Sequence, residues 1–410
     1  MKADTIIPDQ YLAASNAQSC YSSVDICYYI AFGIYCFFHL LERTNYNSIL
    51  GVSIDSIGKI STALMLVFVC ARLATVRFQL TGFVRSAIVL SASLLVFIAT
   101  RSWICLSLAM FVVAGKDIDV KPMVVTMLVT TILVVALVFF GVYTGVIANI
   151  ASRRPGEFKV RNSLGFNQVN ALGAAAARIY VSCVVLLWKK RPIFQMMLAV
   201  ILVGFLEIAA NSRTSELLII VLAVVQSACY HRKNQGKQNA RRVYLICLLL
   251  IWATVLLTFV FLFYFNSSNA FMVWMSNLLS NRLYSAWYIC KTYGVHLFGN
   301  GDMELGQTIW AVDSYALLTI DNAWAQWLVM YGSVPTALIL IGVTSLYVSA
   351  MKSGQIDGRL IVMAMLLSVY AFGETTALAI DYNPLLVLLG IPVFGCSNIN
   401  ANNDMNCERA

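Results

Sequence analysis

Three arginines are the residues best suited to chemistry in this chain: Arg161, Arg213 and Arg282. A guanidinium group is planar, and its N–H donors form a fork that fits two oxygens of a phosphate or carboxylate. Such groups can bind an anionic substrate and stabilise the negative charge that builds on a leaving group. Arg213 is the most informative, because it lies in the short turn 211–214 between two apolar runs.

The general base that would accompany these cations must come from a short set of residues. Asp321 directly precedes an apolar run, and a carboxylate near an arginine cluster can accept a proton from a hydroxyl nucleophile. We therefore predict Asp321 as the base, with Asp313 and His296 as the next candidates. Secondary members of the same site are Asn170, Asn322 and Glu374.

Structural roles compete with these functional ones. Arg178 lies near the middle of an apolar run and can either pair with Glu207 of a neighbouring helix or face a polar cavity. Arg153, Arg154 and Lys159 can be solvated loop charges or anchors to lipid headgroups. The sequence leaves these alternatives open.

The elements that position these residues are transmembrane helices. The 410-residue chain is 60% hydrophobic and only 11% charged, whereas soluble domains carry about 25% charged residues. The net charge of +9 then indicates basic cytoplasmic loops and not nucleic-acid binding. The eleven cysteines lie mostly in apolar runs without metal-ligand spacing, so we expect neither a metal nor another cofactor.

Apolar runs predict an all-α, multi-pass membrane protein of about 12 transmembrane helices, with a range of about 10–13. No soluble domain interrupts the chain, so residues 1–410 form a single transmembrane domain. The predicted spans are 24–42, 57–75, 84–100, 102–115, 122–145, 168–187, 193–210, 214–231, 243–265, 323–350, 359–379 and 383–397.

Two strongly basic loops, 188–192 and 231–242, set the predicted orientation, because Lys and Arg gather on the cytoplasmic side. The turn 211–214 between them is then external, and both termini are cytoplasmic. The loops 146–167 and 266–322 are also external, and the second is long enough to hold short helices. This orientation brings the three arginines and Asp321 to one side of the membrane.

Four segments together resemble the Wzy-type polysaccharide polymerases of the O-antigen polymerase and ligase superfamily. R-N-S-L-G-F-N-Q-V-N at 161–170 is similar to their R-x-S-L-G-F-x-(H/N)-P-N, although Gln168-Val169 replaces the usual pair. The other three are N-S-R-T at 211–214, N-R-L at 281–283 with L-F-G-N-G at 297–301, and D-N at 321–322 followed by Gly332. The related ligases have H-N where this chain has D-N.

The resemblance implies a GT-C-like, lipid-dependent glycosyltransferase in the bacterial plasma (inner) membrane. It would join oligosaccharide repeat units carried on undecaprenyl pyrophosphate into a surface polysaccharide, such as O-antigen, capsule or exopolysaccharide, at the outer face, without a metal. Its partners would be that lipid-linked oligosaccharide, membrane lipid and other export and chain-length proteins. Arg161, Arg213 and Arg282 would bind the pyrophosphate, and Asp321, Arg213 and Arg282 would be catalytic.

Three other functions remain open from the sequence. A ligase would transfer the glycan once to another acceptor, whereas a polymerase makes a ladder of repeat units. A flippase or other transporter of lipid-linked sugar would be favoured by Arg178 in the membrane, but the chain shows no internal repeat. A peptidoglycan-type glycosyltransferase is disfavoured by the R-N-S-L-G-F and D-N segments.

Overall fold

The computed structural model describes residues 22–48, 54–153, 159–188, 190–231, 237–279, 281–310, 315–353 and 355–394. Helices dominate this part of the chain, and nine of them are long and apolar enough to cross a membrane. Three shorter apolar helices accompany them, at Ile104–Ala114, Gly358–Tyr370 and Pro384–Phe394. The predicted all-α, multi-pass membrane architecture is confirmed at this level, while twelve full crossings remain a prediction.

The helices before the long loop are α2 (Ser23–Leu41), α3 (Ile54–Thr75), α4 (Leu80–Thr100), α5 (Ile104–Ala114), α6 (Val120–Tyr143), α7 (Val169–Leu186), α8 (Pro192–Ala209), α9 (Arg213–His231) and α10 (Lys237–Tyr264). The helices after Tyr264 are α11 (Ala270–Leu278), α12 (Arg282–Tyr293), α13 (Ala323–Gln326), α14 (Ser333–Ser353), α15 (Gly358–Met365) and α16 (Gly390–Phe394).

Helix α7 is the most buried of the nine long helices that the structure describes. In its apolar window 72% of the residues are buried, against 17% for α8, so α8 presents most of its surface outward. The reason is composition, because α7 carries Gly173 and the run 174–177 of four alanines, and small residues let neighbouring helices approach closely. Gly173 faces Ser212, whose hydroxyl would lie 2.2 Å from an added Cβ.

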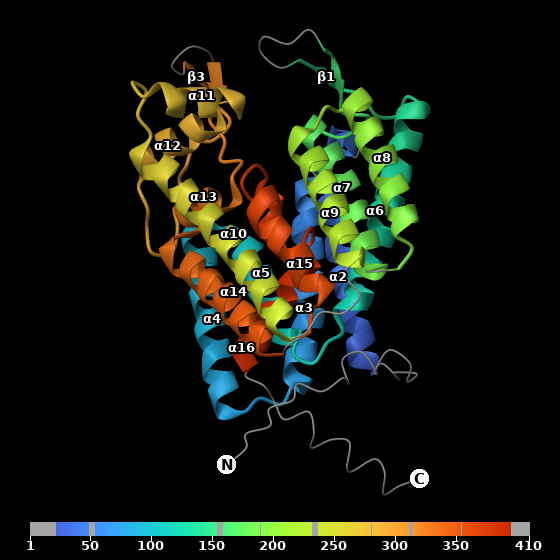
Figure 1. Cartoon of the computed structure of the whole chain (residues 1–410), viewed down its shortest axis with the longest axis vertical. Coiled ribbons are helices and arrows are strands. Elements are labelled where there is room, and N and C mark those ends of the chain that lie inside the picture. The colour runs from blue at the N-terminus through green and yellow to red at the C-terminus, as the bar shows by residue number, and fades with distance from the viewer. Residues whose placement is uncertain are drawn as a thin grey trace, which may run out of the picture.

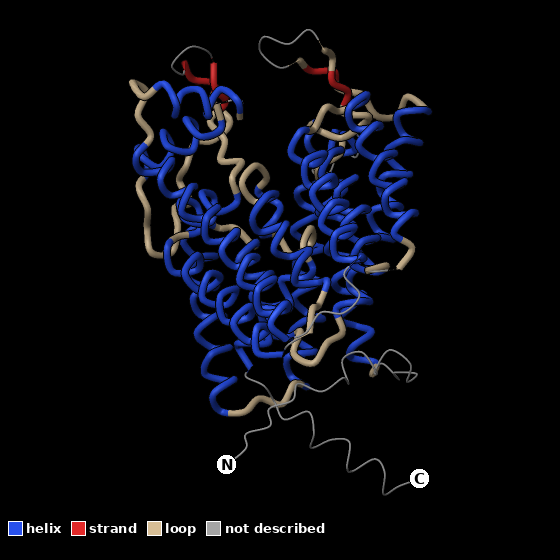
Figure 2. The backbone as a smooth tube through the Cα atoms, in the orientation of Figure 1, coloured by secondary structure: helices blue, strands red, loops and turns tan. Residues whose placement is uncertain are grey.

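Both long loops lie at the same end of the bundle, the upper end in Figure 1. The loop 266–322 contains α11 and α12, which confirms the prediction that it holds short helices. Each loop also contains a two-stranded hairpin that the all-α prediction omitted, drawn red in Figure 2. The pairs are β1 (Ala151–Ser152) with β2 (Arg161–Asn162), and β3 (Thr308–Trp310) with β4 (Tyr315–Leu317).

Two predicted spans are interrupted by irregular backbone. The run 323–350 is divided at Gly332, where the π-helical turn η2 (Trp327–Tyr331) meets α14. The run 359–379 is helical only through the π-helical turn η3 (Leu366–Tyr370). The buried segment 371–383 follows, and it includes the 3₁₀ turn η4 (Thr375–Leu378) before η5 (Pro384–Leu389). Such π-turns occur often at functional sites.

Close backbone packing explains two of the glycine motifs. Gly332 has φ +103, and an added Cβ would lie 2.4 Å from the carbonyl oxygen of Leu297 and 2.5 Å from the nitrogen of Gly299. Ser333 N donates to His296 O at 2.9 Å, and Val334 N donates to Leu297 O at 3.1 Å. The L-F-G-N-G segment and the glycine that follows D-N are therefore partners in one backbone contact.

Gly332→Ala tests this contact. The new methyl group would meet the Leu297 carbonyl oxygen at a φ that alanine rarely adopts, and such strain costs about 1–3 kcal/mol. We expect a lower thermal unfolding midpoint for the purified protein in detergent. The control is Gly204→Ala in α8, where no atom lies within 4 Å of the added Cβ and no positive φ occurs. Equal midpoints for the two variants would contradict the packing.

Candidate functional site

An ion-pair group at the upper end of the bundle joins three segments that are distant in sequence. The Nε of Arg282 lies 2.9 Å from Oδ2 of Asp321, and its Nη1 lies 3.8 Å from Oε1 of Glu374. Nη1 also donates a hydrogen bond to the Gly373 carbonyl oxygen. The guanidinium therefore joins the start of α12, the residue before Asn322 and the segment 371–383.

Local backbone geometry sets the position of Arg282. Asn281 is the N-cap of α12 and has φ +63, a left-handed conformation that asparagine tolerates better than most residues. Its backbone nitrogen donates to Ser276 O at 2.7 Å, which fixes the turn between α11 and α12. The N-R-L segment thus places the arginine on the first residue of a helix.

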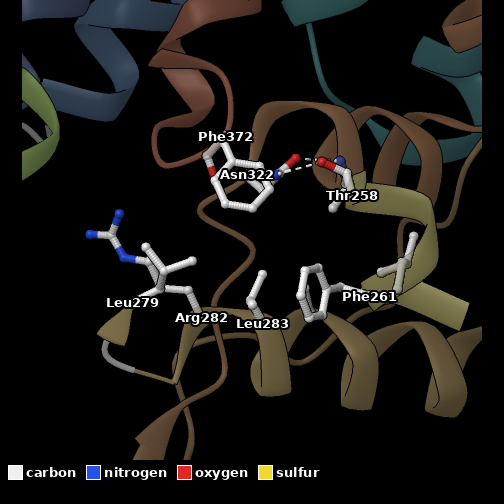
Figure 3. Close-up of a pocket in the computed structure, with 10 residues that line it drawn as sticks. Thr258, Phe261, Leu279, Arg282, Leu283, Asn322 and Phe372 are labelled. Atoms are coloured by element: carbon white, nitrogen blue, oxygen red, sulfur yellow. Dashed lines mark hydrogen bonds between the residues drawn. The ribbon is translucent and has the colours of Figure 1, made fainter. Parts of the chain in front are cut away.

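Asn322, in contrast, has the contacts of a structural residue. Its Oδ1 accepts from Ala325 N at 3.0 Å and caps α13, while Nδ2 donates to Thr258 Oγ1 at 2.9 Å and to Phe372 O at 3.1 Å. Figure 3 shows the asparagine bridging to Thr258 above an apolar crevice that Phe261 and Leu283 also line. Arg282 lines the same crevice, with its guanidinium extending away from Phe261.

Arg161 and Asn170, two of the site candidates, lie in contact. The Nη2 of Arg161 donates to Asn170 Oδ1 at 3.0 Å, and its Nε donates to Ala210 O at 2.8 Å. The start of α7 and the end of α8 are thereby joined through one guanidinium. The alternative pairing of Arg178 with Glu207 is wrong, because Glu207 is half exposed and pairs with Lys159.

The turn 211–214 borders the same site. A Cβ added to Gly373 would lie 3.0 Å from Thr214 Oγ1 and 3.6 Å from Arg282 Nη1, so Thr214 packs beside the ion-pair group. Asn211 makes the turn possible with φ +46. Arg213 itself is exposed at the start of α9, so the structure brings it to the border of the group.

Glu374 is the electrostatic centre of the site. It lies in the segment 371–383, outside the helices that could cross a membrane, and its side chain is only 12% exposed. Burial raises the pKa of its carboxyl to about 7, and Asp321 adds to the shift, while Arg282, Arg43 and Arg161 oppose it. A group that titrates near neutral pH can both accept and return a proton.

The two carboxylates of this group differ in their environment. Asp321 is 33% exposed, and its Oδ2 lies 2.9 Å from the Nε of Arg282. Glu374, a secondary candidate in the sequence, is the more buried of the two and lies farther from Arg282, at 3.8 Å. The sequence alone does not reveal this difference in burial between the two carboxylates.

The other predicted candidates lie elsewhere. His296 is exposed and shares a hydrogen bond with Tyr293 O at 3.0 Å, beyond the far end of α12. A helix of 12 residues separates it from Arg282, a length of about 18 Å. Asp313 lies outside the described residues. Among the residues that the structure describes, no group of three or more His, Cys, Asp or Glu side chains could hold a metal ion.

Four residues that sequence reasoning did not place in the site border it: Arg43, Arg178, Asp381 and Tyr382. The guanidinium carbons of Arg178 and Arg43 lie 4.4 and 4.9 Å from the centroid of the Tyr382 ring. Arg43 directly follows the first apolar run, and the orientation predicted from the basic loops would place it on the external side. That position was a usable signal, because external arginines are few.

Comparisons with known proteins do not identify the chain. No protein-family model, no curated protein and no solved structure matches it.

Asn322 provides a test of the structural assignment. Asn322→Ala removes the cap of α13 and both Nδ2 hydrogen bonds, and the loss of a cap alone costs about 0.5–2 kcal/mol. We expect a clearly lower unfolding midpoint. Asn322→Ser keeps a capping acceptor and loses the two donated bonds, so its midpoint should fall between those of the wild type and the alanine variant. An alanine variant as stable as the wild type would refute the assignment.

Proposed function

We propose that this protein is a metal-independent polymerase that joins lipid-pyrophosphate-linked oligosaccharide repeat units at the outer face of a bacterial plasma membrane. The observation that carries the proposal is the convergence of Arg282, Asp321 and Glu374 at the end of an apolar helical bundle, with Arg161 and Arg43 acting on the same carboxylate. Two of the four motifs that resemble Wzy-type polymerases contribute Arg282 and Asp321 to this group, and a third contributes Arg161, whose charge acts on Glu374.

The chemistry requires a cation and a base at one place. A hydroxyl oxygen of the acceptor sugar attacks the anomeric carbon of the donor, and the bond from that carbon to the pyrophosphate oxygen breaks. The leaving lipid pyrophosphate keeps the bonding electrons, and the guanidinium groups of Arg282 and Arg161 stabilise its charge. The hydroxyl proton passes to the carboxylate of Glu374, whose pKa of about 7 suits proton transfer at neutral pH.

The membrane architecture supports a lipid-linked substrate. The site lies at one end of a bundle whose outward side chains are apolar, so a polyprenyl chain can remain in the bilayer while its headgroup reaches Arg282. No sugar nucleotide is needed, because the pyrophosphate linkage already carries the energy of the bond to be formed.

Arg282→Ala and Arg161→Ala test the cations. Each removes a cation that the proposed leaving group needs, and the loss of one such contact lowers the rate about 10²–10³-fold. We expect cells that depend on either variant to lose the long polymer ladder while the protein still reaches the membrane. The control is Arg359→Gln, at the start of α15. Normal ladders from both alanine variants would refute the proposal.

Glu374 and Asp321 can be separated as bases by pH. A general base works as the carboxylate, so the activity of purified protein on synthetic lipid-pyrophosphate repeat units should rise as pH increases through about 7. Glu374→Gln should abolish elongation and Asp321→Asn should lower it less. A wild-type rate without this acid limb, or elongation by Glu374→Gln, would exclude Glu374 as the base.

The products of the same assay distinguish the alternative enzymes. A ladder of repeat units supports a polymerase, whereas a single transfer to another acceptor indicates a ligase. Movement of lipid-linked sugar across a vesicle membrane without new glycosidic bonds indicates a flippase.

A further inference from the structure

A second set of cations lies behind the ion-pair group and has few partners of its own. Arg178 is only 2% exposed in the middle of α7, and none of its three guanidinium nitrogens has a hydrogen-bond partner of good geometry among the described residues. Its neighbours are the ring of Tyr382, at 4.4 Å, and the thiol of Cys36, a weak acceptor. An unpaired buried charge is costly and marks a functional site more often than a structural one.

Arg43 contacts the same tyrosine ring as this buried arginine, and its charge acts on Glu374. Its guanidinium carbon lies 4.9 Å from the centroid of the same Tyr382 ring. Its charge acts on Glu374, Asp381, Tyr370 and Tyr382. Among the described residues it has no side-chain hydrogen bond or ion pair, so its N–H donors remain for a ligand.

The other arginines of the site differ in this respect. Arg282 is engaged by Asp321, Glu374 and the Gly373 carbonyl, and Arg161 is engaged by Asn170 and the Ala210 carbonyl. A ligand of either arginine would therefore have to compete with these protein acceptors for its N–H donors. Arg43 has no acceptor to give up, which makes it the cation best prepared for an incoming anion.

The net charge of the site also favours anion binding near Arg43. Arg282 with Asp321 and Glu374 has no excess of positive charge, and this group alone would not attract an anion. The carboxylates of the enlarged site are Asp321, Glu374 and Asp381, and its guanidinium groups are those of Arg43, Arg161, Arg178 and Arg282. Arg43 and Arg178 together therefore turn a neutral or negative group into a positive one.

We propose that Arg43 is the principal anion-binding residue of this site and that it takes a phosphate of a pyrophosphate group. The inference deepens the proposed function, because it assigns the pyrophosphate to a residue outside the four motifs. The Tyr382 ring contacts the guanidinium of Arg43 by a cation–π interaction. Arg178 contacts the same ring and adds positive charge to the site.

The test measures binding to the full-length chain in lipid nanodiscs, with inorganic pyrophosphate and farnesyl pyrophosphate as separate probes. We expect Arg43→Gln to weaken the binding of farnesyl pyrophosphate about 10- to 100-fold, the effect of losing charge-assisted hydrogen bonds in a buried site. The matched control is Arg359→Gln, whose native side chain pairs with Asp357 at 2.7 Å at the start of α15. Its affinity should equal that of the wild type.

Each outcome decides something. Weakened binding of both probes identifies the phosphates as the shared ligand, and weakened binding of farnesyl pyrophosphate alone identifies a lipid-linked source. Wild-type affinity in Arg43→Gln, or no binding of either probe to the wild type, overturns the inference. If Arg43→Gln fails to fold, Arg43→Lys replaces it: this variant keeps the charge but loses the planar fork, and it should bind several-fold more weakly. Unchanged affinity in the lysine variant would then overturn the inference.

Pyrophosphate binding by Arg43 can be tested separately from the proposed polymerase activity. Pyrophosphate binding that depends on Arg43, in a protein that makes no polymer from lipid-linked repeat units, would refute the polymerase and leave the anion site. Polymer synthesis with unchanged binding in Arg43→Gln would refute the anion site and leave the polymerase.

Discussion

The guanidinium of Arg282 between two carboxylates is the interaction on which the upper end of the structure depends. A charge taken out of water costs several kcal/mol unless opposite charge and hydrogen bonds compensate it. Asp321 at 2.9 Å, Glu374 at 3.8 Å and the Gly373 carbonyl supply this compensation from two other segments. This interaction therefore holds three segments together: the start of α12, the residue Asp321 just before α13, and the segment 371–383. A shift of any one of them would leave a buried charge without its partner.

The irregular backbone of this region follows from the same constraint. A bundle in lipid must satisfy its backbone groups internally, so non-helical segments persist only where other protein groups supply partners. The segment 371–383 receives such partners, since Ala323 N donates to Ala371 O at 2.8 Å and Asn322 Nδ2 donates to Phe372 O at 3.1 Å. The π-turn η3 leads directly into this segment, and α13, which packs against η4, continues into the π-turn η2 and the break at Gly332. They place polar groups at the end of an otherwise apolar bundle.

Charge balance then separates the residues by role. Arg161 and Arg282 share their donors with protein acceptors, which fixes their geometry. Asn322 caps α13 with its oxygen and donates to Thr258 and Phe372 with its nitrogen. Glu374 is protonated more easily than an ordinary glutamate because it is buried, and this property suits a base next to a pyrophosphate leaving group. Arg43 and Arg178 supply the positive charge that the ion-pair group lacks. In the proposed reaction the arginines bind and stabilise the pyrophosphate, Glu374 accepts the proton, and Asn322 keeps a structural role.

The sequence by itself determined the class of structure, because 60% hydrophobic residues in long runs leave few alternatives to a helical membrane bundle. It also placed Arg161 with Asn170, and Arg282 with Asp321, among the site candidates, since motif and orientation both pointed to them. Only the tertiary structure decided that Glu374 is more buried than Asp321, and that the charge of Arg43 acts on it. Burial and pairing depend on which segments meet in space, and residues as distant as Arg43, Arg282 and Glu374 carry no local signal of that meeting.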